Sequence, residues 1–184
     1  LIDRLDAFMD VGSNVGVFAL FSASLPKAPL VFAFEPNPRV RDVLEMNCDI
    51  NRLGIKVSPL ALSDSIGEAE FFEPESVTSG SLNEGFNAEV VDRYTVSTST
   101  LDELFAKSPE FTGGYGRIMV KMDVLGHESA VLRGAHEFTQ RHLPIYLLEA
   151  VRDYDEDEIT FLRYLGYRFH LILPAGLEEV KTLE

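Results

Sequence analysis

A glycine turn between a strand-like segment and a helix-like segment is the feature that most constrains this chain. An apolar run of Ala7, Phe8 and Met9 leads into Asp10-Val11-Gly12-Ser13-Asn14-Val15-Gly16, and a helix-like apolar segment begins at Val17. Glycines at Gly12 and Gly16 allow a sharp turn and close approach of a ligand, and the first turn of the helix offers unpaired N–H groups. The turn therefore predicts a strand, a turn and a helix with room for a nucleotide-like ligand.

The charge beside this turn narrows the choice of ligand. Asp10 stands at the end of the strand, and Asn14 replaces the second glycine of the dinucleotide pattern G-x-G-x-x-G. A carboxylate repels a pyrophosphate, whereas S-adenosylmethionine carries a positive sulfonium and an ammonium group. Asp10, Gly12, Asn14 and Gly16 are therefore predicted to bind S-adenosylmethionine, with a turn that only closes a parallel sheet as the structural alternative.

A second acidic residue follows the next apolar run. Residues 30–34 are continuously apolar, which is typical of a strand buried on both faces, and Glu35 comes 19 residues after Gly16. An acid about 20 residues beyond such a glycine turn accepts hydrogen bonds from the hydroxyls of a ribose. We therefore predict that Glu35 binds the cofactor ribose and that Asn37, in the proline-flanked loop after it, also binds the cofactor.

Strand-like and helix-like segments alternate along the whole chain. Strands are predicted at residues 6–11, 30–35, 56–61, 117–124, 144–150 and 167–173, with helices in most of the gaps. One predicted helix spans residues 39–53 and ends at Gly54, and another spans 159–165 and ends at Gly166. A Thr100–Glu103 capping box starts a short helix, and residues 76–87 are predicted to form a mobile loop. The pattern predicts an α/β fold with a mostly parallel sheet and helices on both faces, in one domain over residues 1–184.

Ligands of such sheets lie beyond the carboxyl ends of the strands, and acids gather there. Ala61 and Leu62, at the end of the third predicted strand, are predicted to line an adenine pocket. Asp64 is either a contact of the adenine amine or a turn residue. On the fourth predicted strand, Lys121 and Asp123 share one face, so they either form an internal ion pair or serve the reaction.

The order of several stretches resembles that of the FkbM-type family of S-adenosylmethionine-dependent methyltransferases. These stretches are FMDVGSNVG from Phe8, FAFEPNP from Phe32, ALSD from Ala61, TLDEL from Thr100, VKMDVLGHE from Val120 and PIYLLE from Pro144. The resemblance implies a Rossmann-like class I methyltransferase fold and a hydroxyl of a small molecule or carbohydrate as the methyl acceptor. It also implies catalytic roles for Asp123 and Glu149, with a strand-end acid that faces water as the alternative for Glu149. One departure is Leu125, which stands where the family usually has glutamate.

His127 is predicted to be the third catalytic residue, because it is the histidine beside this motif and titrates nearest neutral pH. His136, His142 and His170 are predicted to be packing or surface residues. Because Leu125 removes one possible oxygen ligand, no metal site is predicted.

Composition excludes several partners. The chain has 16 Lys and Arg against 30 Asp and Glu, a formal net charge of −14, which argues against nucleic acid as a substrate. No apolar run is long enough for a membrane span, and the single cysteine, Cys48, fits a reducing compartment, so a cytoplasmic location is expected. The chain is also expected to be the core of a longer protein.

The alternatives to a methyltransferase are a binding module that retains the fold without turnover and a nicotinamide dehydrogenase.

Overall fold

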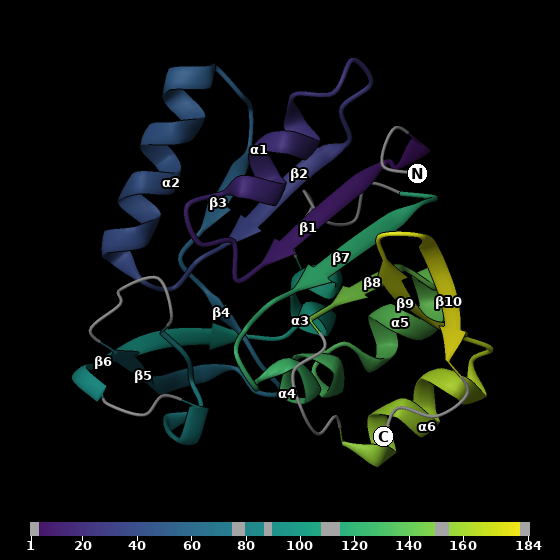
Figure 1. The fold of residues 1–184 in the computed structure, drawn as a ribbon. Helices are drawn as coiled ribbons and strands as arrows, with labels where there is room; N and C mark the ends of the chain where they lie inside the picture. Colours follow the sequence, from purple (N-terminus) through teal and green to yellow (C-terminus); the bar gives the residue numbers. More distant parts are fainter. Residues whose placement is uncertain (1–3, 75–79, 87–89, 108–114, 150–154, 181–184) are drawn as a thin grey trace. The chain divides into compact units, whose positions relative to one another are not determined.

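A parallel sheet carries the glycine turn in the computed structural model, which describes residues 4–74, 80–86, 90–107, 115–149 and 155–180. Five strands pair in the order β3-β2-β1-β7-β8, and every pairing is parallel (Figure 1). Their bounds are β1 Ala7–Val11, β2 Leu30–Phe34, β3 Lys56–Ser58, β7 Ile118–Met122 and β8 Ile145–Leu148. The predicted mostly parallel sheet is confirmed, with β1 at the point where the strand order reverses.

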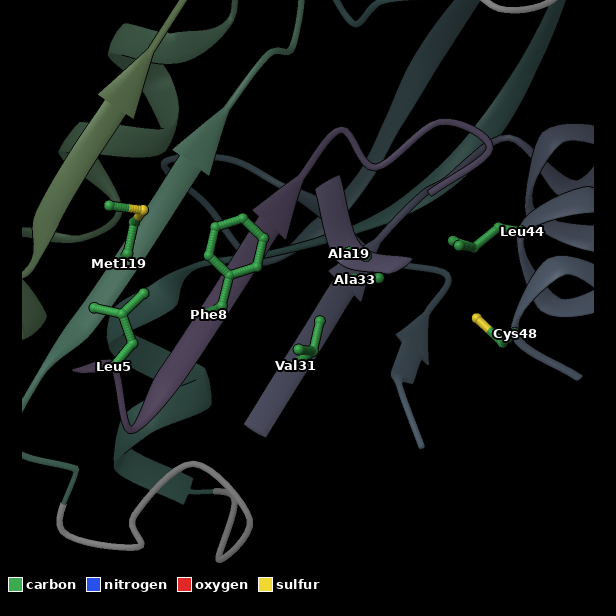
Figure 2. Packing of buried hydrophobic residues seen from close by; sticks show 8 residues of the cluster. All are labelled: Leu5, Phe8, Ala19, Val31, Ala33, Leu44, Cys48 and Met119. Atoms are coloured by element: carbon green, nitrogen blue, oxygen red, sulfur yellow. The ribbon is translucent and has the colours of Figure 1, made fainter. Parts of the chain in front are cut away.

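The apolar runs form these strands because both faces of the sheet are buried. On one face, side chains of β1, β2 and β7 pack against helices α1 (Val17–Ala23) and α2 (Pro38–Asn51), as Figure 2 shows for Leu5, Phe8, Ala19, Val31, Ala33, Leu44, Cys48 and Met119. On the opposite face Met9, Phe32, Phe34 and Val120 are each at most 1% exposed. Continuous apolar runs therefore fit this sheet better than alternating patterns do.

The predicted strand at residues 56–61 is wrong as a single strand. It divides into β3 in the parallel sheet and β4 (Ala61–Leu62) in a second sheet, with Pro59 and Leu60 between them. A proline has no N–H to donate to a ladder, so pairing stops there. The second sheet has the order β4-β6-β5, in which β5 (Gly67–Pro74) runs antiparallel to β6 (Val90–Ser99). Strand β6 was not predicted, because polar residues occupy much of it.

Helix ends follow the predictions only in part. Helix α2 ends at Asn51, and Arg52 rather than Gly54 takes the left-handed conformation, with φ 54°. The Gly54 cap is therefore wrong. Thr100 Oγ1 does accept a hydrogen bond from Glu103 N at 3.0 Å, at the start of α3 (Leu101–Lys107). Helices α4 (Glu128–Arg133) and α5 (His136–His142) follow β7.

The described part of the predicted loop at residues 76–87 is residues 80–86, and the rest lies outside the described residues. The described part holds a 3-10 turn, η3 (Glu84–Phe86), and Ser81 pairs with Phe72 through two backbone hydrogen bonds.

Cys48 is buried on α2, and burial raises the pKa of its thiol, as expected for a packing residue.

Residue contacts divide the chain into two compact units, residues 1–150 and 151–184. The second unit contains α6 (Glu156–Tyr164) and a hairpin of β9 (Phe169–Leu173) and β10 (Gly176–Val180). Gly166, just after α6, has φ 88°, so this predicted cap is confirmed. The predicted strand at 167–173 exists as β9, but it pairs antiparallel with β10 and not within the parallel sheet. One domain over residues 1–184 stays a prediction.

In the part of the chain that is described, no helix has the length and apolar character that a membrane span requires.

Candidate functional site

A cavity of about 300 Å³ opens at the carboxyl ends of β1, β2 and β7. Nine of the eleven predicted site residues line it: Gly12, Asn14, Glu35, Asn37, Ala61, Leu62, Asp123, His127 and Glu149. Sequence reasoning did not identify most of the apolar lining, which includes Leu60, Phe71, Leu82 and Leu125. The position agrees with the crevice in which open α/β sheets bind ligands.

The glycine turn forms one wall and leaves no room for larger residues. Gly12 has φ 71°, and a Cβ atom there would lie 2.0 Å from the carbonyl oxygen of Asp123. Asn14 is also left-handed, with φ 52°, and its side-chain oxygen accepts a hydrogen bond from Val15 N at 2.7 Å. Gly16 has φ 93° and precedes α1, but it does not line the cavity. The turn is therefore fixed by backbone geometry.

Glu35 presents a fixed carboxylate to the same cavity. Its Oε2 accepts a hydrogen bond from Asn14 N and its Oε1 accepts one from Asn37 N, each at 2.9 Å. Only 7% of the residue is exposed, and burial raises the pKa of the carboxyl above its usual value. Each oxygen can accept a further hydrogen bond, so the pair suits a ligand with two neighbouring hydroxyls. The Asn37 side chain caps α2 by accepting from Arg39 N at 3.0 Å.

Asp10 lies behind the cavity. The residue is fully buried and absent from the cavity lining. Its Oδ2 accepts a hydrogen bond from Ala19 N at 3.0 Å, and its Oδ1 lies 3.0 Å from Lys121 Nζ. Burial raises the pKa of the Asp10 carboxyl, against the opposing effect of Lys121. The structure thus gives Asp10 an ion pair and a helix contact, and a role in cofactor binding stays a prediction.

Two acids meet at the rim where β7 and β8 end. A hydrogen bond to Asp123, then partial burial, raises the pKa of Glu149 to about 7. The Asp123 side chain is 41% exposed, and Glu149 is exposed as well. Two carboxyls this close share a proton readily, because two like charges repel each other. This pair can therefore take up or release a proton near neutral pH.

His127 lines the cavity beside this rim and is held by a serine. Its Nε2 lies 3.0 Å from Ser63 Oγ, a hydrogen bond whose direction depends on the histidine tautomer. Burial lowers the pKa of the imidazole, which favours the neutral ring at pH 7. Ser63 follows β4 directly, so the sequence separates by 64 residues two groups that the fold brings together.

The turn between β7 and α4 is held from two sides. Glu128, 4% exposed, accepts hydrogen bonds from Val124 N and Gly126 N, each at 3.0 Å. Ser81 Oγ donates to the Leu125 carbonyl at 2.9 Å. Leu125 itself has φ 53°, a strained conformation for a leucine that these bonds stabilise. Glu128 therefore supports the turn and does not line the cavity.

Asp64 lies away from the cavity, after the end of β4. It is exposed, outside the cavity lining, and its Oδ2 lies 3.3 Å from Arg133 Nη2. Within the described ranges, no group of three or more His, Cys, Asp or Glu side chains is arranged to hold a metal ion.

Comparison with known proteins identifies the family of this chain. The model of the methyltransferase FkbM domain matches residues 10–169, which include all the residues that line the cavity. The chain belongs to the FkbM methyltransferase family. The predicted family is confirmed, and the family implies S-adenosylmethionine as methyl donor.

Two known methyltransferases are similar to this chain in sequence. The chain is 37% identical over 131 residues to the hexuronic acid methyltransferase AglP of Haloferax volcanii, covering 70% of this chain and 49% of AglP. It is 32% identical over 104 residues to the 31-O-demethyl-FK506 methyltransferase FkbM of Streptomyces tacrolimicus, covering 47% of this chain and 40% of that protein. The chain thus spans about half the length of these relatives or less.

A solved structure shares the fold. Methyltransferase FkbM from Methylobacillus flagellatus superposes with a TM-score of 0.57 at 16% identity, over 90% of this chain and 39% of that one. The class I, Rossmann-like fold predicted from the sequence is confirmed.

Proposed function

We propose that this methyltransferase uses S-adenosylmethionine to methylate a hydroxyl oxygen of a carbohydrate or another small molecule. The observation that carries the proposal is one cavity that has the fixed Glu35 carboxylate on one wall and the Asp123–Glu149 pair at its rim. The Glu35 carboxylate suits the hydroxyls of a ribose, and the Asp123–Glu149 pair suits proton transfer.

The residues of the cavity fit the cofactor. Glu35 would accept hydrogen bonds from the ribose hydroxyls, and the apolar side chains of Leu60, Leu62 and Phe71 would contact the adenine. When bound, S-adenosylmethionine supplies a methyl group activated by a positively charged sulfur. The acids near the rim favour a cationic ligand by charge.

The chain's part in the reaction is to align the acceptor and to take its proton. Methylation of a hydroxyl releases one proton, and the Asp123–Glu149 pair can hold it near neutral pH. His127, held neutral in the same cavity, is a second group that can accept it. Asp123→Asn and His127→Ala are each expected to lower kcat about a hundredfold, within the usual contribution of general bases, while the Kd of S-adenosylhomocysteine changes by less than about threefold.

Charge also favours one class of acceptor. Among the described residues that line the cavity, the charged side chains are Glu35, Asp123 and Glu149, with no lysine or arginine. A carboxylate on the acceptor would be repelled by these groups. We therefore propose a neutral hydroxyl compound as acceptor, although the name of one relative specifies a hexuronic acid.

The test is methyl transfer from donor labelled with a CD3 group, followed by mass spectrometry of the acceptor. Calorimetry should first show binding of S-adenosylmethionine and S-adenosylhomocysteine. A neutral hexoside and the matching hexuronate are then compared, and the proposal expects faster transfer to the hexoside. Faster transfer to the hexuronate would overturn the neutral acceptor, and no cofactor binding would overturn the whole proposal. Binding without turnover on a broad panel of hydroxyl compounds would favour the binding module instead.

A further inference from the structure

Lys121 is a buried cation at the centre of the sheet, and the function proposed above does not use it. It lies on β7, is 5% exposed and does not line the cavity. A lysine in such a position is costly unless its charge is paired. Its contacts therefore show what it stabilises.

Four groups surround the ammonium. Its Nζ lies 3.0 Å from Asp10 Oδ1 and donates a hydrogen bond to the Gly12 carbonyl at 2.9 Å. It also lies 3.6 Å from Asp123 Oδ2 and 5.4 Å from the centre of the Phe18 ring. Gly12 and Asp123 both line the cavity, so one cation contacts the glycine turn and the acidic rim together.

The charges around this cation are mostly negative. The described titratable groups that interact with it are Asp10 from β1, Glu35 after β2, Asp123 after β7 and Glu149 after β8, and Glu128 at the start of α4 acts on Glu149. Lys121 lies closer to Asp123, whereas Glu149 is hydrogen-bonded to Asp123. A nearby cation favours the ionised form of a carboxyl. Lys121 therefore attracts the Asp123 carboxylate, while the contact with Asp123 raises the pKa of Glu149.

We propose that Lys121 is a positioning residue for methyl transfer: its ammonium group holds the Asp123 carboxylate and the Gly12 carbonyl together at the cavity rim, beside Glu149. The link to methyl transfer rests on the proposed function, whereas the contact of Lys121 with the rim does not. The test therefore combines a titration of the ligand-free protein with a measurement of enzyme activity.

A double variant keeps the test independent of folding. Lys121→Met alone leaves Asp10 buried without its cation, which destabilises the fold strongly. Asp10→Asn with Lys121→Met removes both charges, and the asparagine oxygen can still accept the hydrogen bond of Ala19 N. Lys107→Met, at an exposed lysine of α3, is the control for loss of a positive charge.

The first measurement follows the side-chain carboxyls of Asp123 and Glu149 by ¹³C NMR as the ligand-free protein is titrated. In the wild type and in Lys107→Met we expect the Glu149 carboxyl to titrate near pH 7. In the double variant the midpoint of the Glu149 carboxyl should rise by about one unit, because Lys121 no longer lowers its pKa. Unchanged curves for both carboxyls would overturn the proposal.

The second measurement is the pH profile of kcat with the CD3-labelled donor. The double variant should lose at least tenfold in kcat, and the midpoint of its profile should move to higher pH. A profile like that of the wild type would overturn the role in transfer. If even the wild type transfers no methyl group, the proposed function fails, and the NMR titration still decides whether Lys121 acts on the rim carboxyls.

Discussion

Replacing Glu35 by glutamine tests the ribose contact with little change of shape. In the structure both carboxylate oxygens already accept a backbone hydrogen bond, from Asn14 N and Asn37 N. A bound ribose would add one charge-assisted bond to each oxygen. Such bonds contribute about 1.5–3 kcal/mol each, against about 0.5–1.5 kcal/mol for neutral ones.

The loss expected from Glu35→Gln follows from this difference. Two bonds weakened by about 1–1.5 kcal/mol each give about 2–3 kcal/mol, or about a 30- to 150-fold increase in the Kd of S-adenosylhomocysteine. Calorimetry measures it directly. The glutamine NH2 also faces one backbone N–H, so we expect a lower melting temperature as well.

A ligand without the ribose 2′-hydroxyl separates these two effects. The 2′-deoxy analogue of S-adenosylhomocysteine should bind the wild type more weakly, whereas Glu35→Gln should distinguish poorly between the two ligands. Glu68→Gln, at an exposed position of β5, is the matched control and should bind like the wild type. A Kd of Glu35→Gln within about threefold of the wild type would mean that Glu35 does not bind the ribose, because even one weakened bond exceeds that effect.

Four further predictions concern the rest of the site. Gly12→Ala should abolish cofactor binding or folding, because its Cβ would lie 2.0 Å from the Asp123 carbonyl oxygen, whereas Gly54→Ala, with no atom within 4 Å, should leave a urea unfolding curve almost unchanged. Glu128→Ala should lower the free energy of unfolding by about 1–3 kcal/mol, since two backbone N–H groups lose their acceptor. The rate of methyl transfer should rise between pH 6 and 8, because the raised pKa of Glu149, about 7, leaves its carboxyl ionised and able to accept a proton only above this pH. Glu149→Gln should therefore flatten the profile. Treatment with EDTA should leave the rate unchanged.

Each of these predictions has an outcome that contradicts it. Wild-type binding by Gly12→Ala would mean that the turn can move. An unfolding free energy of Glu128→Ala equal to that of the exposed-site variant Glu137→Ala would mean that water replaces the lost acceptor. A rate that falls as the pH rises, or an unchanged profile in Glu149→Gln, would remove Glu149 from proton transfer. Loss of activity in EDTA that Mg²⁺ restores would establish a required metal.

The strands of the parallel sheet could be predicted because their apolar runs report burial on both faces. Where polar residues fill a strand, as in β6, the same signal is missing, and the break at Pro59 requires knowing which sheet each half joins. The Gly54 cap failed for a different reason. Arg52 adopts the left-handed conformation before the chain reaches the glycine, and its preference cannot be inferred from residue type.

Where a motif fixes a residue at the end of a strand, its position at the cavity could be predicted. Glu35 and Asp123 line the cavity because each follows directly on a buried strand of the same sheet. Contacts across the fold were not predictable in this way. The sequence paired Lys121 with Asp123, whereas the strand register places Asp10 opposite Lys121, so the lysine lies closer to Asp10. Likewise no local pattern links His127 to Ser63.

A crystal structure of this chain with S-adenosylhomocysteine tests directly whether the cavity binds the cofactor through Glu35. We expect the ribose hydroxyls within hydrogen-bond distance of both Glu35 oxygens, and the sulfur on the side of the cavity that Gly12 and Asp123 line. A nucleoside bound elsewhere, or a ribose without contact to Glu35, would rule out this mode of binding.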